Sequence, residues 1–196
     1  MALPHPRYHS PREYLLAERE SEIKHEYLDG EVFAMAGASE SHNIITGNTY
    51  AALHSQLRKR PCNVYPSDMR VRTPDSGLYS YPDISVVCGD TQIDREIGDT
   101  LLNPTVIIEI LSPTTERFDK GKKLQHYRRI PSLQAYLLIA QDIAQVEMYL
   151  RQGDQWIYSD FTAFDAVINL PMIGCTLTLS DIYEKVILLT DKGTDT

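Results

Sequence analysis

Short runs in which apolar and polar residues alternate recur along the chain, and this period of two is typical of half-buried β-strands. Two such runs within residues 24–35 flank Asp29 and Gly30, a dipeptide that favours a two-residue hairpin turn. Other strands are expected at residues 63–65, 69–73 and 80–88 and, in a second hairpin around Gly153, at 146–150 and 155–159. The pattern therefore predicts a protein built largely from short strands.

Two further runs are apolar at nearly every position, at residues 105–111 and 135–140. A strand of this composition is normally covered on both faces of its sheet. Asn103 and Pro104 precede the first run, and proline suits the start of a strand. We therefore expect these two strands to lie inside the fold.

Apolar residues with helical spacing predict four helices. The first begins with Ser10 as N-cap and Pro11 in the first turn. The third is expected to begin at Ser112, with Pro113 in its first turn, and to end before Pro131. The expected helices begin at residue 11 and cover residues 41–57, 112–130 and 179–183. This order of elements predicts an α/β (α+β) fold, in which helices flank a mixed central β-sheet and extra hairpins extend it.

Length and composition indicate one globular domain over residues 1–196. No apolar run approaches the roughly 20 residues that cross a bilayer, so no membrane partner is expected. The three cysteines, Cys62, Cys88 and Cys175, are scattered and form no Cys-x-x-Cys pair. They are interpreted as buried thiols, not as a disulfide framework or a zinc site, which predicts a cytoplasmic protein.

The formal net charge of −8 argues against tight, non-specific binding to nucleic acid. Two local basic segments remain, at residues 58–60 and 120–129. The simplest interpretation of each is a solvated helix face. For residues 120–129 the alternative, a role in a functional site, is stronger, because these residues follow the acidic positions considered next.

Two carboxylates stand among apolar, β-branched residues. Asp83 follows Tyr81 and Pro82 at the start of one such run, and Glu109 lies inside another. Burial of a carboxylate is costly unless the group is paired or binds a cation. The two acids are therefore the main candidates for a functional site.

Side chains alternate between the two faces of a strand. Asp83 is therefore expected on the same face as Ser85, and Glu109 on the same face as Ile107 and Leu111. If the two strands are neighbours, both carboxylates reach one point, where their oxygens suit a hard cation such as Mg²⁺. Such a site activates water and neutralises charge on a phosphoryl group.

The helix that follows the second carboxylate contributes lysines. At about 100° per residue, Lys120, Lys123 and Tyr127 lie on one side of this helix. Lys123 can then point at the carboxylates, where it would orient the attacking water or stabilise a pentavalent transition state. The alternative is a surface ion pair between Lys123 and Asp119 or Glu116.

Several of these segments, in their order and spacing, resemble the PD-(D/E)xK nuclease superfamily. Within it the chain resembles the Uma2-like group, formerly a domain of unknown function that is abundant in cyanobacteria. The resemblance covers residues 10–185 approximately and rests on residues 25–32, 41–42, 81–87, 109–115 and on Asp119 with Lys123 and Tyr127. It implies a restriction-endonuclease-like core and a phosphodiesterase site that uses Mg²⁺, with Mn²⁺ as a substitute.

Residue by residue, the resemblance assigns Asp83 to the Pro-Asp acid and Glu109 to the (D/E) acid, both as metal ligands and catalytic residues. The third signature position, a lysine in the superfamily, is Leu111 here. In the Uma2-like group the lysine lies on the following helix, which offers Lys123, with Lys120 as the second choice. The departure at Leu111 leaves open a member that keeps the fold without catalysis.

Three more residues are candidates. The resemblance places Glu26 near the catalytic group as a further ligand or a water-orienting base, and the alternative is an exposed strand carboxylate. His42 lies near a helix N-terminus, where a histidine either joins the site or caps and packs. Tyr127 is expected to pack in the core with its hydroxyl near the site.

Three functions are compatible with these residues. The first is a metal-dependent endonuclease that hydrolyses DNA, expected as a homodimer because two-fold symmetry suits a duplex. The second is a catalytically impaired nucleic-acid-binding or regulatory protein, which the leucine at position 111 and the acidic charge favour. The third is a phosphodiesterase that acts on a small nucleotide. A basic helix face along an open groove would favour the first over the third.

Overall fold

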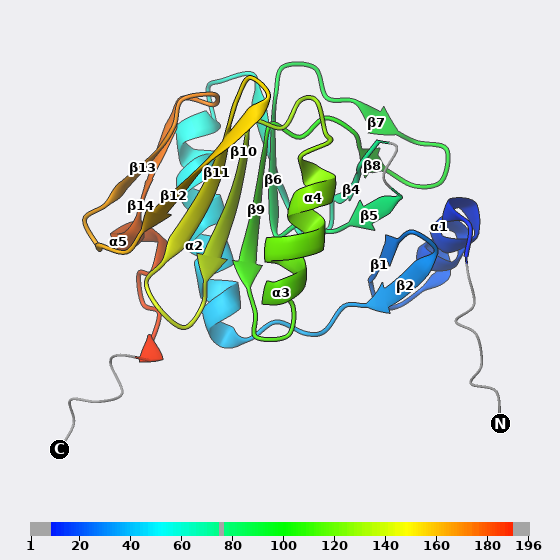
Figure 1. Ribbon diagram of the computed structural model, residues 1–196, viewed down its shortest axis with the longest axis horizontal. Coiled ribbons are helices and arrows are strands. Elements are labelled where there is room, and N and C mark those ends of the chain that lie inside the picture. Colours follow the sequence, from blue (N-terminus) through cyan, green and yellow to red (C-terminus); the bar gives the residue numbers. More distant parts are fainter. Residues whose placement is uncertain (1–8, 75–76, 190–196) are drawn as a thin grey trace.

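The computed structural model describes residues 9–74 and 77–189 (Figure 1). These residues form two six-stranded sheets and a separate two-stranded hairpin, with a few helices packed around them. The expected mixed α/β (α+β) class is confirmed. The single domain predicted over residues 1–196 stays a prediction, and residues 1–8, 75–76 and 190–196 of it lie outside the described part of the chain.

The central sheet has the strand order β12-β11-β10-β9-β6-β3. Its strands β9 and β10 are parallel, and the other neighbours are antiparallel, so the sheet is mixed as expected. Almost every residue of β9 and β10 is buried, which confirms the prediction for the two apolar runs. The bounds are β3 Cys62–Pro66, β6 Ile84–Cys88, β9 Val106–Leu111, β10 Ala135–Ala140, β11 Val146–Gln152 and β12 Gln155–Phe161.

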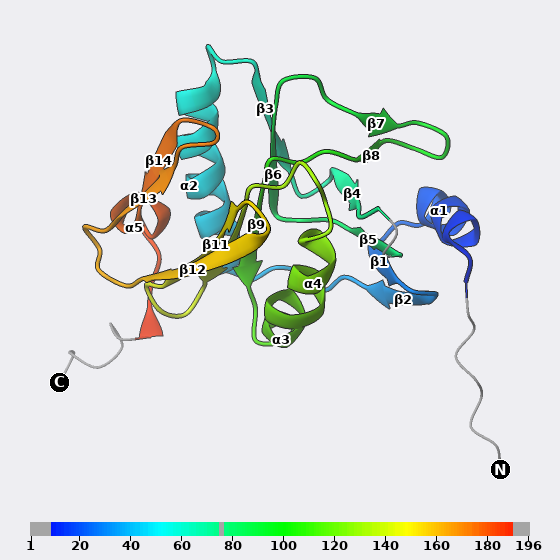
Figure 2. The same cartoon turned by 45° about the horizontal axis from the view of Figure 1, so that its top comes forward.

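The second sheet has the order β2-β1-β5-β4-β8-β7 and lies beside the β6–β9 side of the central sheet (Figure 2). Its β1–β2 hairpin turns at Asp29 and Gly30, both with positive φ (48° and 97°), as the dipeptide predicts. The short strands β7 and β8 had no clear signal in the sequence. The bounds are β1 His25–Leu28, β2 Glu31–Ala34, β4 Arg70–Arg72, β5 Leu78–Ser80, β7 Ile93–Asp94 and β8 Thr100–Leu101.

Helices cover both faces of the central sheet (Figures 1 and 2). One face packs on α2 through Ile45 and Leu53, and the other packs on α4 through Tyr127. A third hairpin, which the sequence did not predict, packs beside α2. The bounds are α1 Pro11–Glu20, α2 Glu40–Leu57, α3 Glu116–Phe118, η1 Asp119–Lys123, α4 Leu124–Tyr127, α5 Leu179–Ile182, β13 Val167–Leu170 and β14 Cys175–Thr178. In the described residues, no helix has the length and apolarity that a bilayer crossing requires.

The strand predicted at residues 80–88 is wrong as a single element. It is divided into β5, which ends at Ser80, and β6, which begins at Ile84, and the two belong to different sheets. Pro82 lies at the break, where it has no backbone N–H to donate to a ladder. Asp83 therefore lies just before β6, at the junction of the two sheets, and not within a strand.

The helix predicted over residues 112–130 is shorter and irregular. Ser112 is not its N-cap: the Ser112 carbonyl accepts the N–H groups of Thr115 and Glu116 in a turn, and the helix begins at Glu116. Its middle is a π-helical turn, η1, which is rare and often found at functional sites. The rotation of 100° per residue that an α-helix has does not apply across this turn, because a π-helix has more residues per turn than an α-helix.

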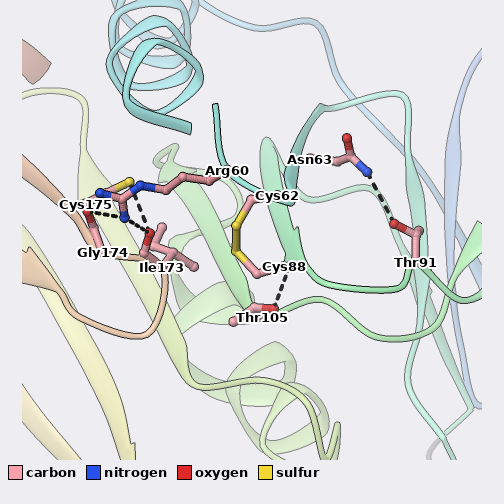
Figure 3. The surroundings of a disulfide bond; sticks show 9 residues. All are labelled: Arg60, Cys62, Asn63, Cys88, Thr91, Thr105, Ile173, Gly174 and Cys175. Atoms are coloured by element: carbon pink, nitrogen blue, oxygen red, sulfur yellow. Dashed lines mark hydrogen bonds between the residues drawn. A yellow bond between two sulfur atoms is a disulfide. The ribbon is translucent and has the colours of Figure 1, made fainter. Parts of the chain in front are cut away.

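Two of the three cysteines form a disulfide, contrary to the expectation of buried thiols. Cys62 and Cys88 face one another in the antiparallel β3–β6 pair, with Cα atoms 4.0 Å apart (Figure 3). Their N–H groups donate to Arg60 and Thr105 instead of to each other, so the pair is non-hydrogen-bonded, the type in which side chains lie closest. Sequence spacing did not reveal this register. Cys175 is a buried free thiol, as expected.

The disulfide removes the argument from free thiols on which the cytoplasmic location was based, and that location stays a prediction.

Reduction of the Cys62–Cys88 bond frees a loop with a sequence separation of 26. We expect dithiothreitol to lower the free energy of unfolding by about 3 kcal/mol, measured by urea unfolding. In the Cys62→Ser/Cys88→Ser variant the reductant should change nothing. Equal stability of oxidised and reduced wild type would contradict the prediction.

Candidate active site

Asp83 and Glu109 meet at the junction between β6 and β9. In the β6–β9 ladder Ile84 pairs with Ile108, so the next position on each strand brings Asp83 opposite Glu109. The backbone N–H of Asp83 donates to Glu109 Oε2 at 3.3 Å, and the N–H of Ile110 donates to Asp83 Oδ2 at 2.7 Å. The two acids that the sequence singled out are therefore neighbours.

Lys123 lies at the centre of the carboxylate cluster, which comprises Glu26, Asp83, Glu109 and Asp119. Its Nζ is 2.9 Å from Glu26 Oε1, 3.1 Å from Glu109 Oε1 and 3.1 Å from Asp119 Oδ1. The side chains of Lys123 and Glu109 are only 6% and 5% exposed. Three elements distant in sequence, β1, β9 and η1, therefore converge on one ammonium group.

A pair of hydroxyl groups adds to the contacts of Glu109 Oε1, the oxygen that also faces Lys123. Tyr127 donates its hydroxyl proton to Glu109 Oε1 at 3.0 Å, and its oxygen lies 2.8 Å from Ser80 Oγ. Because the single Tyr127 proton is used on Glu109, Ser80 must donate to Tyr127. Tyr127 is fully buried, as expected, and Glu109 accepts from both Tyr127 and Lys123 at one oxygen.

His42 connects the cluster to the N-terminus of α2. Ser39, the N-cap, accepts the backbone N–H of His42, and His42 Nε2 lies 3.0 Å from Asp83 Oδ1. The side chains of His42 and Asp83 are 15% and 16% exposed, about three times as much as those of Lys123 and Glu109. The cluster therefore opens to solvent on the side of His42 and Asp83.

Lys120 lies outside the cluster, contrary to its place as second choice for the catalytic lysine. Its Nζ pairs with Glu116 and with Glu147 of β11, at 2.8 Å each. The π turn separates Lys120 from Lys123, because the wider turn directs the two lysines to different neighbours. The geometric estimate that placed Lys120, Lys123 and Tyr127 on one side therefore holds only for the last two.

Asp119 joins the cluster without having been chosen as a site residue. In the sequence it was one of the residues on which the family resemblance rests and a possible surface ion-pair partner of Lys123; the pair does form, but Asp119 is 2% exposed. Tyr136 donates its hydroxyl to the Asp119 carbonyl at 3.2 Å and so anchors the π turn on β10. The spacing of four residues between Asp119 and Lys123 was the signal in the sequence for their ion pair. The burial of that pair could not be inferred from the sequence.

The cluster holds more negative charge than one lysine neutralises. Burial raises the pKa of Asp83 to about 7, although the N–H of Ile110 and the ammonium of Lys123 lower it. Burial, together with Asp119 and Asp83, also keeps the pKa of Glu109 well above its usual range. Burial lowers the pKa of Lys123, but Glu109 and Glu26 more than offset this, and the net pKa is raised. Burial lowers the pKa of His42.

These residues fit a Mg²⁺ site with few protein ligands. No group of three or more His, Cys, Asp or Glu side chains in residues 9–74 and 77–189 forms a complete cage for a metal. Mg²⁺ usually needs only one or two carboxylates, and waters and substrate phosphates complete its shell. Asp83 and Glu109 supply such a pair, and the surplus negative charge around them favours a cation.

Comparison with known proteins gives the family directly. The family model Uma2, described as "Putative restriction endonuclease", matches residues 11–180. The chain belongs to the Uma2 family. Two Synechocystis proteins are similar to it: the uncharacterized protein slr1290 is 33% identical over 175 residues, covering 89% of this chain and 90% of that protein. The uncharacterized protein sll1609 is 37% identical over 158 residues, covering 80% and 89%.

The Uma2 fold of this chain also resembles a solved structure. A crystal structure from Anabaena variabilis, titled as a putative nuclease belonging to DUF820, superposes with a TM-score of 0.74. The match covers 90% of this chain and 98% of that one, at 22% sequence identity. At this identity the likeness concerns the fold alone. The expected nuclease-like fold and family are confirmed, with relatives in cyanobacteria as the resemblance implied.

Two of the three lysines of the π turn, Lys123 and Lys120, give a first prediction. Lys123→Ala leaves three buried carboxylates without their cation and should lower the free energy of unfolding at pH 7.5 by about 3–5 kcal/mol. Lys120→Ala removes a lysine that is 33% exposed, and should cost less than about 1 kcal/mol. Urea unfolding measures both, and equal losses would contradict the arrangement.

Asp83 gives a second prediction, for metal-free protein in EDTA. Its pKa of about 7 in the folded state exceeds that of an unfolded aspartate, about 3.9, so the folded state binds this proton more tightly. The free energy of unfolding should therefore fall as the pH rises from about 4 to about 7. Asp83→Asn, which keeps an acceptor for Ile110, should show a smaller fall. An unchanged pH dependence would refute the assignment.

Proposed function

We propose that this chain is a metal-dependent endonuclease that hydrolyses phosphodiester bonds in DNA. The observation that carries the proposal is the contact between Asp83 and Glu109 with the Lys123 ammonium on Glu109. The membership of the Uma2 family and the nuclease-like fold support a nuclease in general. The DNA substrate and the dependence on Mg²⁺ are the specific parts of the proposal.

Asp83 and Glu109 would hold Mg²⁺, or Mn²⁺ in its place. The ion, when bound, supplies a Lewis acid that activates water and neutralises phosphoryl charge. His42 and the N–H of Ile110 hold the Asp83 carboxylate in place, and Tyr127 does the same for Glu109. The chain thus positions both carboxylates by hydrogen bonds before any ligand arrives.

Lys123 supplies the cation that the usual signature places at Leu111. Leu111 is a buried apolar residue that packs in the core beside Tyr127, whereas Lys123 reaches Glu109 from η1. An ammonium at this point would orient the attacking water and stabilise the charge of the pentavalent transition state. Glu26, which pairs with Lys123, would keep that ammonium in place and protonated.

The catalytically impaired alternative also has a specific observation in its favour. Lys123 is enclosed by three carboxylates and almost inaccessible, so it is already neutralised in this state. A DNA-binding protein that keeps the fold would need no reactive lysine. The third hypothesis, a small-nucleotide phosphodiesterase, gains no support from two surface cavities beside α1 and β5, because residues of the cluster line neither of them.

The finer features of the proposal concern the substrate and the assembly. Exposed basic side chains occur along the helical segment that carries Lys123 and directly after it, at Arg117, Lys122, Arg128 and Arg129. They would contact phosphates of DNA despite the net charge of −8. A homodimer would place two sites on the two strands of a duplex, and a cytoplasmic location would bring the protein to DNA.

A plasmid-nicking assay tests the proposal. Wild-type protein should nick DNA with Mg²⁺ or Mn²⁺ and lose this activity in EDTA. Asp83→Asn and Glu109→Gln should reduce the rate at least about 100-fold, because each removes a charge from the metal site. Lys120→Ala, three residues from Lys123 but outside the cluster, should keep the wild-type rate.

Two results would contradict the proposal. Cleavage that survives in Asp83→Asn would place the activity outside the carboxylate cluster. Absence of cleavage by the wild type on single-stranded, nicked and duplex DNA with both metals, together with measurable DNA binding by fluorescence anisotropy, would favour the impaired alternative.

A further inference from the structure

Tyr81 lies between the two sheets, immediately before Pro82 and Asp83, and the proposed chemistry does not use its side chain. The residue is 8% exposed. Its hydroxyl donates to Glu18 Oε1 at 3.1 Å and accepts from Arg70 Nη1 at 3.2 Å. A tyrosine hydroxyl held between a carboxylate and a guanidinium has its direction fixed from both sides.

Glu18 connects Tyr81 with the strand that carries Glu26. This carboxylate, on α1, accepts the backbone N–H of His25 at 2.9 Å, and its second oxygen lies 3.0 Å from His25 Nδ1. The Glu18 side chain is 4% exposed, so it is a buried acid whose hydrogen bonds all go to the two segments that flank the cluster. Glu18 therefore sets the distance between β1 and Tyr81.

Arg70 fixes the other side of Tyr81. It is 6% exposed and donates to Thr100 Oγ1 at 3.0 Å and to the carbonyl of Ile97 at 3.0 Å, as well as to Tyr81. Arg70 belongs to β4 and Thr100 to β8, which are parallel neighbours in the second sheet. The position of Tyr81 is thereby tied to the second sheet as a whole.

The backbone of Tyr81 reaches the carboxylate cluster. Its N–H donates to Glu26 Oε1 at 3.3 Å, and the same oxygen lies 2.9 Å from Lys123 Nζ. The β1–β5 ladder pairs Tyr27 with Tyr79, and two residues later this N–H bonds a side chain instead of the backbone of β1. The contacts form a closed ring from Glu18 to His25, Glu26, Tyr81 and back to Glu18.

We propose that Tyr81 is a positioning residue of the candidate active site: its hydroxyl, held by Glu18 and Arg70, aims its backbone N–H at Glu26 and keeps that carboxylate on Lys123. The proposal rests on the proposed nuclease function and extends it to three residues outside the cluster, Tyr81, Glu18 and Arg70. Without the hydroxyl contacts, the segment before Pro82 can shift, and Glu26 loses one of its two partners.

The chain offers a matched control for the loss of a buried tyrosine hydroxyl. Tyr183 is 4% exposed, accepts the N–H of Gln145 at 3.1 Å and lies 2.8 Å from the carbonyl oxygens of Ala140 and Gln145. It packs in the core on the α2 side of the central sheet. Tyr81→Phe and Tyr183→Phe therefore each remove a buried hydroxyl that donates and accepts, with charged partners for Tyr81 and backbone partners for Tyr183, but only the first touches the ring around Glu26.

The first measurement is hydrogen exchange at the amide of residue 81 in metal-free protein, by NMR. Tyr81→Phe and Glu18→Gln should accelerate it about ten-fold, the effect of one weakened hydrogen bond, and Tyr183→Phe should leave it unchanged. Glu26→Ala should accelerate it too, because it removes the acceptor. No acceleration in Tyr81→Phe, or an equal one in Tyr183→Phe, would overturn the proposal.

The second measurement is the rate of DNA cleavage. Tyr81→Phe should lower kcat about ten-fold with KM unchanged, whereas Tyr183→Phe should keep the wild-type kcat. An unchanged kcat in Tyr81→Phe, despite faster exchange at residue 81, would overturn the role in catalysis. If the wild type cleaves nothing, the proposed function fails, and the exchange data alone decide whether Tyr81 positions Glu26.

Discussion

The ion pairs of one buried ammonium hold the candidate active site together. Lys123 meets Glu26, Glu109 and Asp119, and each comes from a different element, so the second sheet, the central sheet and the irregular helix are joined at a single atom. The charges do not balance: with Asp83 nearby, four carboxylates face one lysine. Isolated charges are costly to bury, and such an arrangement is stable only if protons or another cation reduce the excess. Burial raises the pKa values of Asp83 and Glu109, and the neighbouring carboxylates raise them further.

At Pro82 the chain passes from the second sheet to the central sheet, so the candidate site receives residues from both. Before Pro82, Arg70 connects the Tyr81 hydroxyl to the second sheet, and Glu18 connects it to α1. After it, Asp83 contacts β9 and the N-terminus of α2. If one continuous strand ran through Pro82, Tyr81 and Asp83 would lie in the same sheet. Residues of the two sheets could then not meet at the acids. The junction of the two sheets is therefore what allows Glu26 and Asp83, more than fifty residues apart, to join one cluster.

Much of this could be predicted from the sequence, and the failures have identifiable causes. Alternation and apolar runs located β9, β10 and both predicted hairpins, because burial dictates these patterns locally. A carboxylate inside an apolar run drew attention to Glu109 for the same reason. Glu18 and Arg70 gave no such signal, since each looks like an ordinary charged residue until the two sheets are assembled. The Cys62–Cys88 pairing and the exclusion of Lys120 depended on a strand register and a π turn, neither of which residue spacing reveals.

The π turn carries a consequence for how this lysine could have arisen and how easily it could be lost. A π turn holds one residue more than the α-helix around it requires. Deletion of a single residue between Asp119 and Lys123 would restore regular winding, and every side chain after it would rotate by about 100° relative to β9. Lys123 and Tyr127 would then both face away from Glu109. The alignment of these two residues is thus a matter of chain length, and an insertion or deletion here would alter it as surely as a substitution.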